Sequence, residues 1–227
     1  MFFFDPMYLL FAAPAMLVML YAQARVRSAY GKYAKVPNMS RVNGLDVARK
    51  LVGAFGLQVM IEEHPGTLTD HYDPRRKALR FSRDIYNTPS VASLGIVAHE
   101  VGHALQDHYG YAPMRLRSAL VPVANIGTKV GYVFFFLGII IGMSGFVWLG
   151  IILFSAAVLF SLATLPVELD ASRRAKQMLT AAGLVTEEES QGVNAVLSAA
   201  ALTYVAALLQ AVATLLYFVY IAMGSRR

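Results

Sequence analysis

The chain has 227 residues, of which 57% are hydrophobic and only 15% are charged. Soluble domains carry about 25% charged residues, so this composition excludes an ordinary soluble domain and is typical of a membrane protein. The formal net charge is +6, and the sequence contains no cysteine. Disulfides and thiolate metal ligands are therefore excluded, and any metal must be held by histidines and carboxylates.

Four apolar stretches are long enough to cross the hydrocarbon layer of a bilayer, which takes roughly 20 residues as a helix. They cover residues 8–24, 120–141, 146–165 and 202–223. We therefore predict an α-helical multi-pass membrane protein that forms a single membrane-integrated domain. Polar segments at 25–118 and 166–193 lie between these spans, and we expect the first to form a small α+β domain and the second a cytoplasmic helix.

The basic residues flank the predicted spans. Fourteen of the 20 lysines and arginines lie within 25–117, and more follow the third span at 173–176. Because cytoplasmic loops are enriched in lysine and arginine, both polar segments are predicted to face the cytoplasm and the turn at 142–145 to face outward. The orientation of the chain in the cell membrane thereby explains the net positive charge. We expect the lipid bilayer as a partner and no nucleic acid. The sequence does not indicate an oligomeric state.

Within the polar segment, the hydrophobic spacing and the turn residues predict short elements. Residues 44–54 have helical spacing, 57–63 alternate like a strand, and 67–82 resemble two strands joined by an Asp-Pro turn. Thr88-Pro89 is typical of a helix start and Gly110 of a stop, so we predict a helix over 89–109.

The stretch VAHEVGHALQ, residues 97–106, lies inside this predicted helix. His99 and His103 are four residues apart, so both imidazoles lie on one face and can reach one ion. Glu100 is rotated off that face, where it can act as the base on a metal-bound water without being a ligand. The alternative is that the two histidines merely form hydrogen bonds in a core.

A catalytic zinc site needs three protein ligands and one open position. His108 points elsewhere on the helix, and His64 and His71 lie in turn or strand segments, where a solvated or hydrogen-bonding role is the better interpretation. The stronger candidate is Glu168, three residues beyond the third span and on the predicted cytoplasmic side. Its alternative role is a capping carboxylate in the first turn after a proline.

The chain resembles known families at these positions. HEVGH followed by a glutamate in the form E-x-x-A resembles the membrane gluzincins of the HtpX and CAAX prenyl protease types. The set TDHYDP, AHEVGHA, YAPMRLRSALVPVANIG, TLPVELDASRRA and AALTYVAA is more similar to the bacterial YugP-type neutral zinc metallopeptidases, over nearly the whole chain. The resemblance implies a gluzincin-like domain that holds one Zn²⁺ per chain on His99, His103 and Glu168, with Glu100 as the base.

One position departs from the HtpX-type pattern. That pattern has an aspartate four residues after the ligand glutamate, where it orients a zinc histidine, but this chain has Ser172 there. Either Asp170 takes over this supporting role or the support is built differently. Candidate donors for an oxyanion are Arg173, Arg174, His71 and Tyr86, although the arginines are explained equally well as surface charges beside the membrane.

Three functions compete at this point. The first is a membrane-embedded zinc endopeptidase that hydrolyses peptide bonds of a peptide or membrane protein at the cytoplasmic membrane surface. The second is an intramembrane-cleaving metalloprotease, which requires the HEVGH motif inside a span. The third is a zinc-stabilised membrane scaffold without activity, for which a base such as Glu100 has no use.

Overall fold

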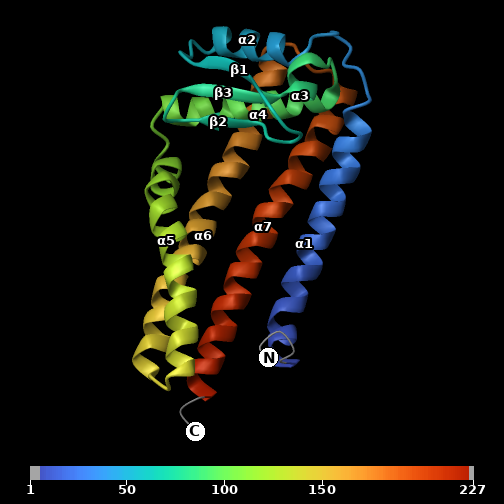
Figure 1. Ribbon diagram of the computed structural model, residues 1–227. Helices are drawn as coiled ribbons and strands as arrows, with labels where there is room; N and C mark the ends of the chain where they lie inside the picture. Colours follow the sequence, from blue (N-terminus) through green and yellow to red (C-terminus); the bar gives the residue numbers. More distant parts are fainter. Residues whose placement is uncertain (1–5, 225–227) are drawn as a thin grey trace. The chain divides into compact units, whose positions relative to one another are not determined.

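The computed structural model describes residues 6–224 of the chain (Figure 1). This part of the chain folds into seven helices and a sheet of three strands. The elements in chain order are α1 (Pro6–Tyr33), α2 (Gly44–Ala54), β1 (Met60–His64), β2 (His71–Asp73), β3 (Ala78–Ser82), α3 (Arg83–Asn87), α4 (Val91–His108), α5 (Ala112–Ile140), α6 (Ser144–Ala181) and α7 (Glu187–Gly224).

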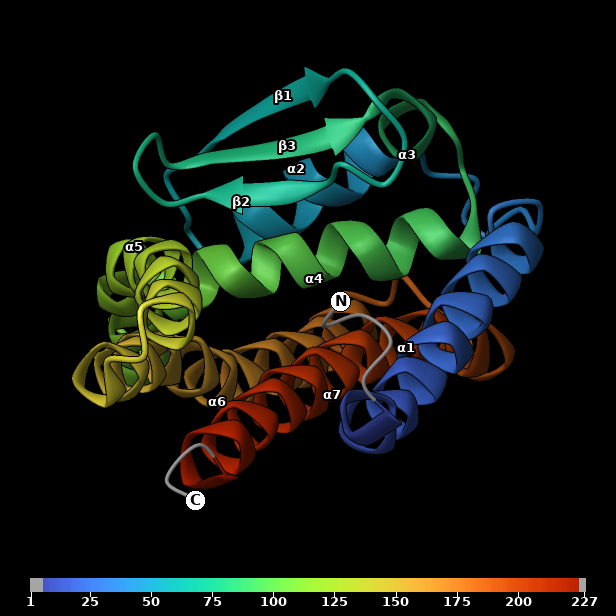
Figure 2. The ribbon, with the colours of Figure 1, turned by 60° about the horizontal axis from the view of Figure 1, so that its bottom comes forward.

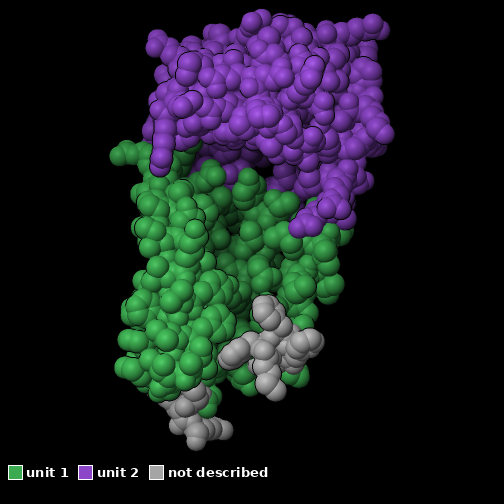
Figure 3. All heavy atoms as spheres, in the orientation of Figure 1, with its two compact units in different colours: residues 1–22, 113–166, 203–227 green, residues 23–112, 167–202 purple. Residues whose placement is uncertain are grey.

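The chain divides into two compact units, which Figure 3 shows in different colours. The first unit, here called the helical unit, comprises residues 1–22, 113–166 and 203–227. The second, here called the sheet unit, comprises residues 23–112 and 167–202. Each unit is described by itself.

The helical unit consists of stretches of α1, α5, α6 and α7, and these four helices are long and apolar enough to cross a membrane. Large apolar side chains on all four helices point away from the protein, including Leu17, Ile126, Ile152 and Leu216. The predicted fold class, a helical chain with four membrane-spanning helices and a small α+β part, is confirmed.

Small residues allow α5 and α6 to pack closely in the helical unit. A Cβ atom added at Gly131 would lie 2.9 Å from the backbone oxygen of Gly150, so a side chain there would separate the two helices. The rings of Phe135 on α5 and Phe218 on α7 stack with their centroids 3.9 Å apart. On α1, Tyr8 packs edge-on against Tyr217 of α7 at 5.2 Å.

The sheet unit contains a mixed sheet with the strand order β1-β3-β2. β1 pairs with β3 in parallel, and β2 pairs with β3 in an antiparallel ladder that aligns Tyr72 with Leu79. Both predicted strands of the 67–82 segment are therefore present, joined by the turn at 74–77. The strand predicted over 57–63 begins only at Met60. Figure 2 shows α4 running alongside β2, the edge strand nearest to it.

The helix that carries the HEVGH motif, α4, begins at Val91 and not at Pro89 as predicted. The Ser90 side chain caps this helix by accepting a hydrogen bond from the backbone N–H of Ser93. The predicted stop is confirmed, because Gly110 follows the helix with a φ of 61°. Most of α4 is buried, as expected for a helix at the centre of its unit.

The other helices show three further local features. The five-residue helix α3 was not predicted. Pro166 lies inside α6, which continues through it to Ala181, so residues 166–193 form the second half of α6, a turn, and the first residues of α7. A capping box begins α7, because Thr186 and Glu189 exchange backbone-to-side-chain hydrogen bonds.

Candidate metal centre

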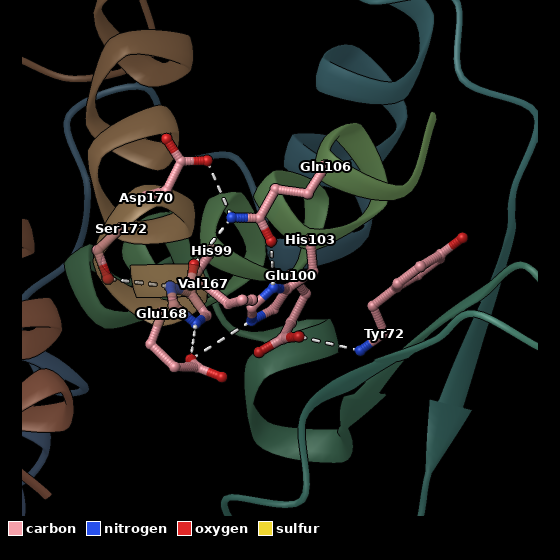
Figure 4. A network of polar contacts seen from close by, with 9 residues as sticks. All are labelled: Tyr72, His99, Glu100, His103, Gln106, Val167, Glu168, Asp170 and Ser172. Carbon is pink, nitrogen blue, oxygen red and sulfur yellow. Dashed lines mark hydrogen bonds and ion pairs between the residues drawn. The ribbon is translucent and has the colours of Figure 1, made fainter. Parts of the chain in front are cut away.

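The two histidines of the motif meet on one face of α4, as their spacing predicts. Their ring centroids lie 4.7 Å apart with the ring planes nearly perpendicular. The side chains are mostly buried, His103 more so than His99. The Nε2 atoms of both imidazoles point toward the same position (Figure 4).

That point is occupied by the carboxylate of Glu168 from α6. Its Oε2 lies 3.2 Å from Nε2 of His99 and 3.4 Å from Nε2 of His103. Glu168 is only 1% exposed. One ligand atom from each of the three residues lies within 4.8 Å of the others, so this set is able to hold a metal ion.

A glycine inside the motif explains how α6 comes close enough for Glu168 to reach the histidines. A Cβ atom added at Gly102 would lie 2.8 Å from the backbone oxygen of Ala171, which is shorter than real Cβ contacts. Ala171 is itself fully buried. The small residues at 102 and 171 therefore set the separation of α4 and α6 at the level of the three ligands.

The donor set suits a zinc ion. Zinc binds imidazole nitrogens and carboxylate oxygens at about 2.0–2.2 Å, and in a tetrahedral site such atoms lie about 3.4 Å apart. The two nitrogen–oxygen distances found here, 3.2 and 3.4 Å, agree with that spacing. Two imidazoles and one carboxylate make three protein ligands, which is the number that leaves one position of a catalytic zinc for water or substrate.

Glu100 is fixed next to this cluster by the sheet. Its Oε2 accepts a hydrogen bond of 2.9 Å from the backbone N–H of Tyr72 on β2, and the residue is buried. Because β2 is an edge strand, this N–H points away from β3 and toward α4. The second carboxylate oxygen, Oε1, is thereby left as the atom that can accept a proton.

The negative charges of the cluster act on His103. Burial on its own would lower the pKa of His103, because it disfavours the charged imidazolium. The hydrogen bond to Glu168 and the charges of Glu100 and Glu168 outweigh burial, so the pKa lies above its ordinary value. The carboxylates thus stabilise positive charge at this position, which a metal cation also supplies.

Each histidine has a partner for its other ring nitrogen. Ser172 Oγ lies 3.2 Å from Nδ1 of His99, so the serine at the position that departs from the HtpX-type pattern contacts a ligand histidine. Nδ1 of His103 lies 3.0 Å from Oε1 of Gln106, whose Nε2 donates to Asp170. Asp170 therefore reaches a histidine through Gln106, a residue that the motif analysis did not consider.

The remaining candidates lie as follows. Arg173 and Arg174 on α6 both form ion pairs with Asp170. His71 on β2 has its Nδ1 2.7 Å from the backbone oxygen of Thr69, and its ring packs against His64. Tyr86 lies on α3.

Comparisons with known proteins agree with this geometry. A sequence model of the family described as "Putative neutral zinc metallopeptidase" matches residues 8–223. The chain is 46% identical over 207 residues to the "Putative membrane protease YugP" of Bacillus subtilis (strain 168). The aligned residues make up 91% of this chain and 92% of that protein. No solved structure matches significantly. The chain belongs to this neutral zinc metallopeptidase family, and its apolar helices and this relative support an association with the membrane.

Proposed function

We propose that the protein is a membrane-embedded, zinc-dependent endopeptidase with one zinc ion per chain. Its ligands are His99, His103 and Glu168, and Glu100 is the catalytic base. The observation that carries the proposal is the buried cluster in which three ligand atoms lie within 4.8 Å of one another. The base follows the first ligand directly in the sequence and is held by the backbone of β2.

In this mechanism a bound zinc ion would act as a Lewis acid that lowers the pKa of a water molecule toward about 7. Glu100 would take a proton from the attacking water at Oε1 while the water oxygen bonds to the peptide carbonyl carbon. Glu100 would then give this proton to the peptide nitrogen as the C–N bond breaks, which releases the amine and leaves the carboxylate product. The hydrogen bond from the Tyr72 N–H to Oε2 keeps the carboxylate in one orientation during both transfers.

The substrate is proposed to lie beside β2. An extended peptide can be held at a sheet edge through backbone hydrogen bonds, which do not depend on its side chains. Because the Tyr72 N–H is already donated to Glu100, the backbone group of Tyr72 left for the peptide is its carbonyl oxygen. Of the two edge strands, β2 is the one whose backbone reaches Glu100. A peptide on this edge would therefore pass the base, whereas a peptide on β1 would lie on the far side of β3.

We further propose that the chain is a single membrane-integrated domain whose site opens at the cytoplasmic surface of the cell membrane. The basic flanks of the predicted spans support this orientation. α4 is not among the four helices that are apolar enough to cross a membrane, which favours a site outside the hydrocarbon layer over an intramembrane-cleaving protease. The substrate is a peptide or a membrane protein.

The Glu100→Gln substitution tests the proposed catalysis. The amide keeps the shape of the side chain and can still accept a hydrogen bond from the Tyr72 N–H, but it cannot take a proton from water. We expect zinc content near one per chain and a loss of peptide cleavage by at least about 100-fold. Zinc is measured by elemental analysis of the purified protein, and cleavage with a quenched fluorescent peptide library or with membrane proteins that accumulate in cells.

Glu187→Gln provides the matched control, because Glu187 is an exposed glutamate at the start of α7. It should change neither zinc content nor cleavage. If Glu100→Gln cleaves as well as the unaltered protein, Glu100 is not the base. If the unaltered protein holds zinc but cleaves nothing, and a fourth protein ligand is found on the metal, the non-catalytic scaffold is the correct function.

A further inference from the structure

Gln106 is a fully buried polar residue whose side chain makes three hydrogen-bonding contacts within the sheet unit. It lies on α4, three residues after His103, and is 0% exposed. Its Nε2 donates to the backbone oxygen of Val167 at 2.8 Å and to Oδ2 of Asp170 at 2.9 Å. Its Oε1 lies 3.0 Å from Nδ1 of His103 (Figure 4).

These contacts fix the orientation of the Gln106 amide. The NH₂ group has two donor hydrogens, and both acceptors beside it, a backbone carbonyl and a carboxylate, are unable to donate. Reversing the amide would place its oxygen against these two acceptors and leave them without a donor, which is costly for buried groups. Oε1 is therefore the atom that faces His103.

The amide orientation in turn selects the tautomer of His103. An amide oxygen only accepts hydrogen bonds, so the Nδ1 atom opposite it must carry a proton. The lone pair of a neutral imidazole then lies on Nε2, the nitrogen that faces Glu168. This is the nitrogen that the proposed zinc site requires as a ligand.

Asp170 holds Gln106 in place from α6. The Asp170 carboxylate is buried and is paired with the guanidinium groups of Arg173 and Arg174 on the same helix. These two cations keep it in the charged form, which accepts a stronger hydrogen bond from an amide than a neutral group does. The chain of contacts thus runs from the arginines through Asp170 and Gln106 to His103.

We propose that Gln106 is a positioning residue of the metal site, which holds His103 in the tautomer that presents Nε2 to the metal and is itself held by Asp170. This inference rests on the proposed zinc site. Gln106 lies outside the HEVGH motif. Asp170 then supports His103 indirectly, by holding Gln106, rather than by contacting a proposed ligand itself.

The test compares zinc affinities of the full-length protein in detergent, measured by competition with a chromophoric chelator. Gln106→Met has a similar volume but no acceptor for the Nδ1 proton. Loss of such a supporting hydrogen bond costs about 10- to 100-fold in metal affinity, and we expect a loss in this range. The control is Gln191→Met at an exposed glutamine on α7, which should leave the affinity unchanged.

A double-mutant cycle distinguishes positioning from a general effect on packing. Asp170→Ala should weaken zinc binding by about fivefold when Gln106 is present, because Gln106 then loses one of its two acceptors. Combined with Gln106→Met, it should cause no further loss, because Asp170 acts through Gln106. Equal effects of Asp170→Ala in the two backgrounds would overturn the inference.

Circular dichroism of the metal-free variants shows whether they fold. If Gln106→Met does not fold, Asp170→Ala alone decides, and an unchanged zinc affinity then contradicts the proposed chain of contacts. If the unaltered protein binds zinc and Gln106→Met binds it equally well, this inference fails while the proposed function stands. If the unaltered protein binds no zinc, the proposed function and the inference both fail.

Discussion

The two histidines proposed as ligands have different supporting partners, and they also differ in burial. His103 is contacted by Gln106, which water does not reach. His99 is contacted by Ser172 from α6 and remains slightly more open to solvent. A water molecule can replace a lost partner more easily at a partly exposed position, so the two supporting contacts should differ in their effect on metal binding.

Ser172→Ala is therefore expected to be a mild variant. If Nε2 of His99 binds the proposed zinc ion, Nδ1 carries the ring proton and the serine oxygen accepts a hydrogen bond from it. We expect zinc affinity to fall by about tenfold or less, at the low end of the effects of such partners. Chelator competition measures the change, and Ser198→Ala on the exposed side of α7 should cause none. A loss as large as that of Gln106→Met would show that burial does not set the difference.

The sequence predicted the part of the site that depends on local spacing. His99 and His103 meet because they are one helical turn apart, a property of any helix. Glu168 was predicted from its place after the third span together with the family resemblance. Gln106 was missed because a glutamine in a helix has no motif, and its role depends on which residues of α6 pack opposite it. Its position three residues after a ligand histidine is the available signal.

At the scale of elements, the site depends on the close approach of α4 and α6. α4 carries two of the proposed ligands and α6 the third, and Gly102 lies against the backbone of Ala171 between the two helices. Two features of the HEVGH motif are therefore used. Its histidines and glutamate are the proposed metal ligands and base, while its glycine allows the close approach of Glu168.

Gly102→Ala tests this geometric role. The added Cβ would lie 2.8 Å from the oxygen of Ala171, so the helices must separate. Overpacking of this kind costs about 1–3 kcal/mol, and we expect a lower thermal midpoint together with weaker zinc binding.

Gly53→Ala is the matched control, because Gly53 lies in α2 with nothing within 4 Å of the added Cβ. It should stabilise the protein slightly, since alanine is favoured over glycine in a helix by roughly 0.5–1 kcal/mol. Unchanged zinc affinity in Gly102→Ala would show that α6 does not need this close approach to deliver Glu168.

The prediction of the elements failed where longer-range packing overrides a local signal. Pro89 is typical of a first helical residue, yet the buried Ser90 provides the cap and the helix begins at Val91. Pro166 suggested a helix start after the third span, but α6 continues through it to Ala181. The residues of α3 were too few for hydrophobic spacing to indicate a helix.

At the scale of the whole molecule, one helix connects the membrane part of the chain with the metal ligands. α6 runs without interruption from Ser144 to Ala181 and contains both the predicted span at 146–165 and Glu168. The proposal that the site lies at the cytoplasmic membrane surface uses this continuity of α6 together with the basic flanks of the predicted spans.

Single cysteines test this orientation, and the chain has no native cysteine to interfere. Arg75→Cys lies in the exposed turn between β2 and β3, and Ser144→Cys at the exposed start of α6. In intact cells a membrane-impermeant thiol reagent should label the second variant and not the first, while permeabilised cells should show both. Labelling of Arg75→Cys alone in intact cells would place the active site outside.

The zinc affinity of Glu168→Gln in the full-length protein tests the central claim most directly. This substitution removes the anionic ligand and keeps the length of the side chain. Because a ligand is lost and not merely a supporting partner, we expect a decrease of more than about 100-fold relative to the unaltered protein, with the metal content falling well below one per chain. If Glu168→Gln keeps one zinc ion per chain at the affinity of the unaltered protein, α6 does not supply the third ligand, and the proposed link between membrane and metal site is wrong.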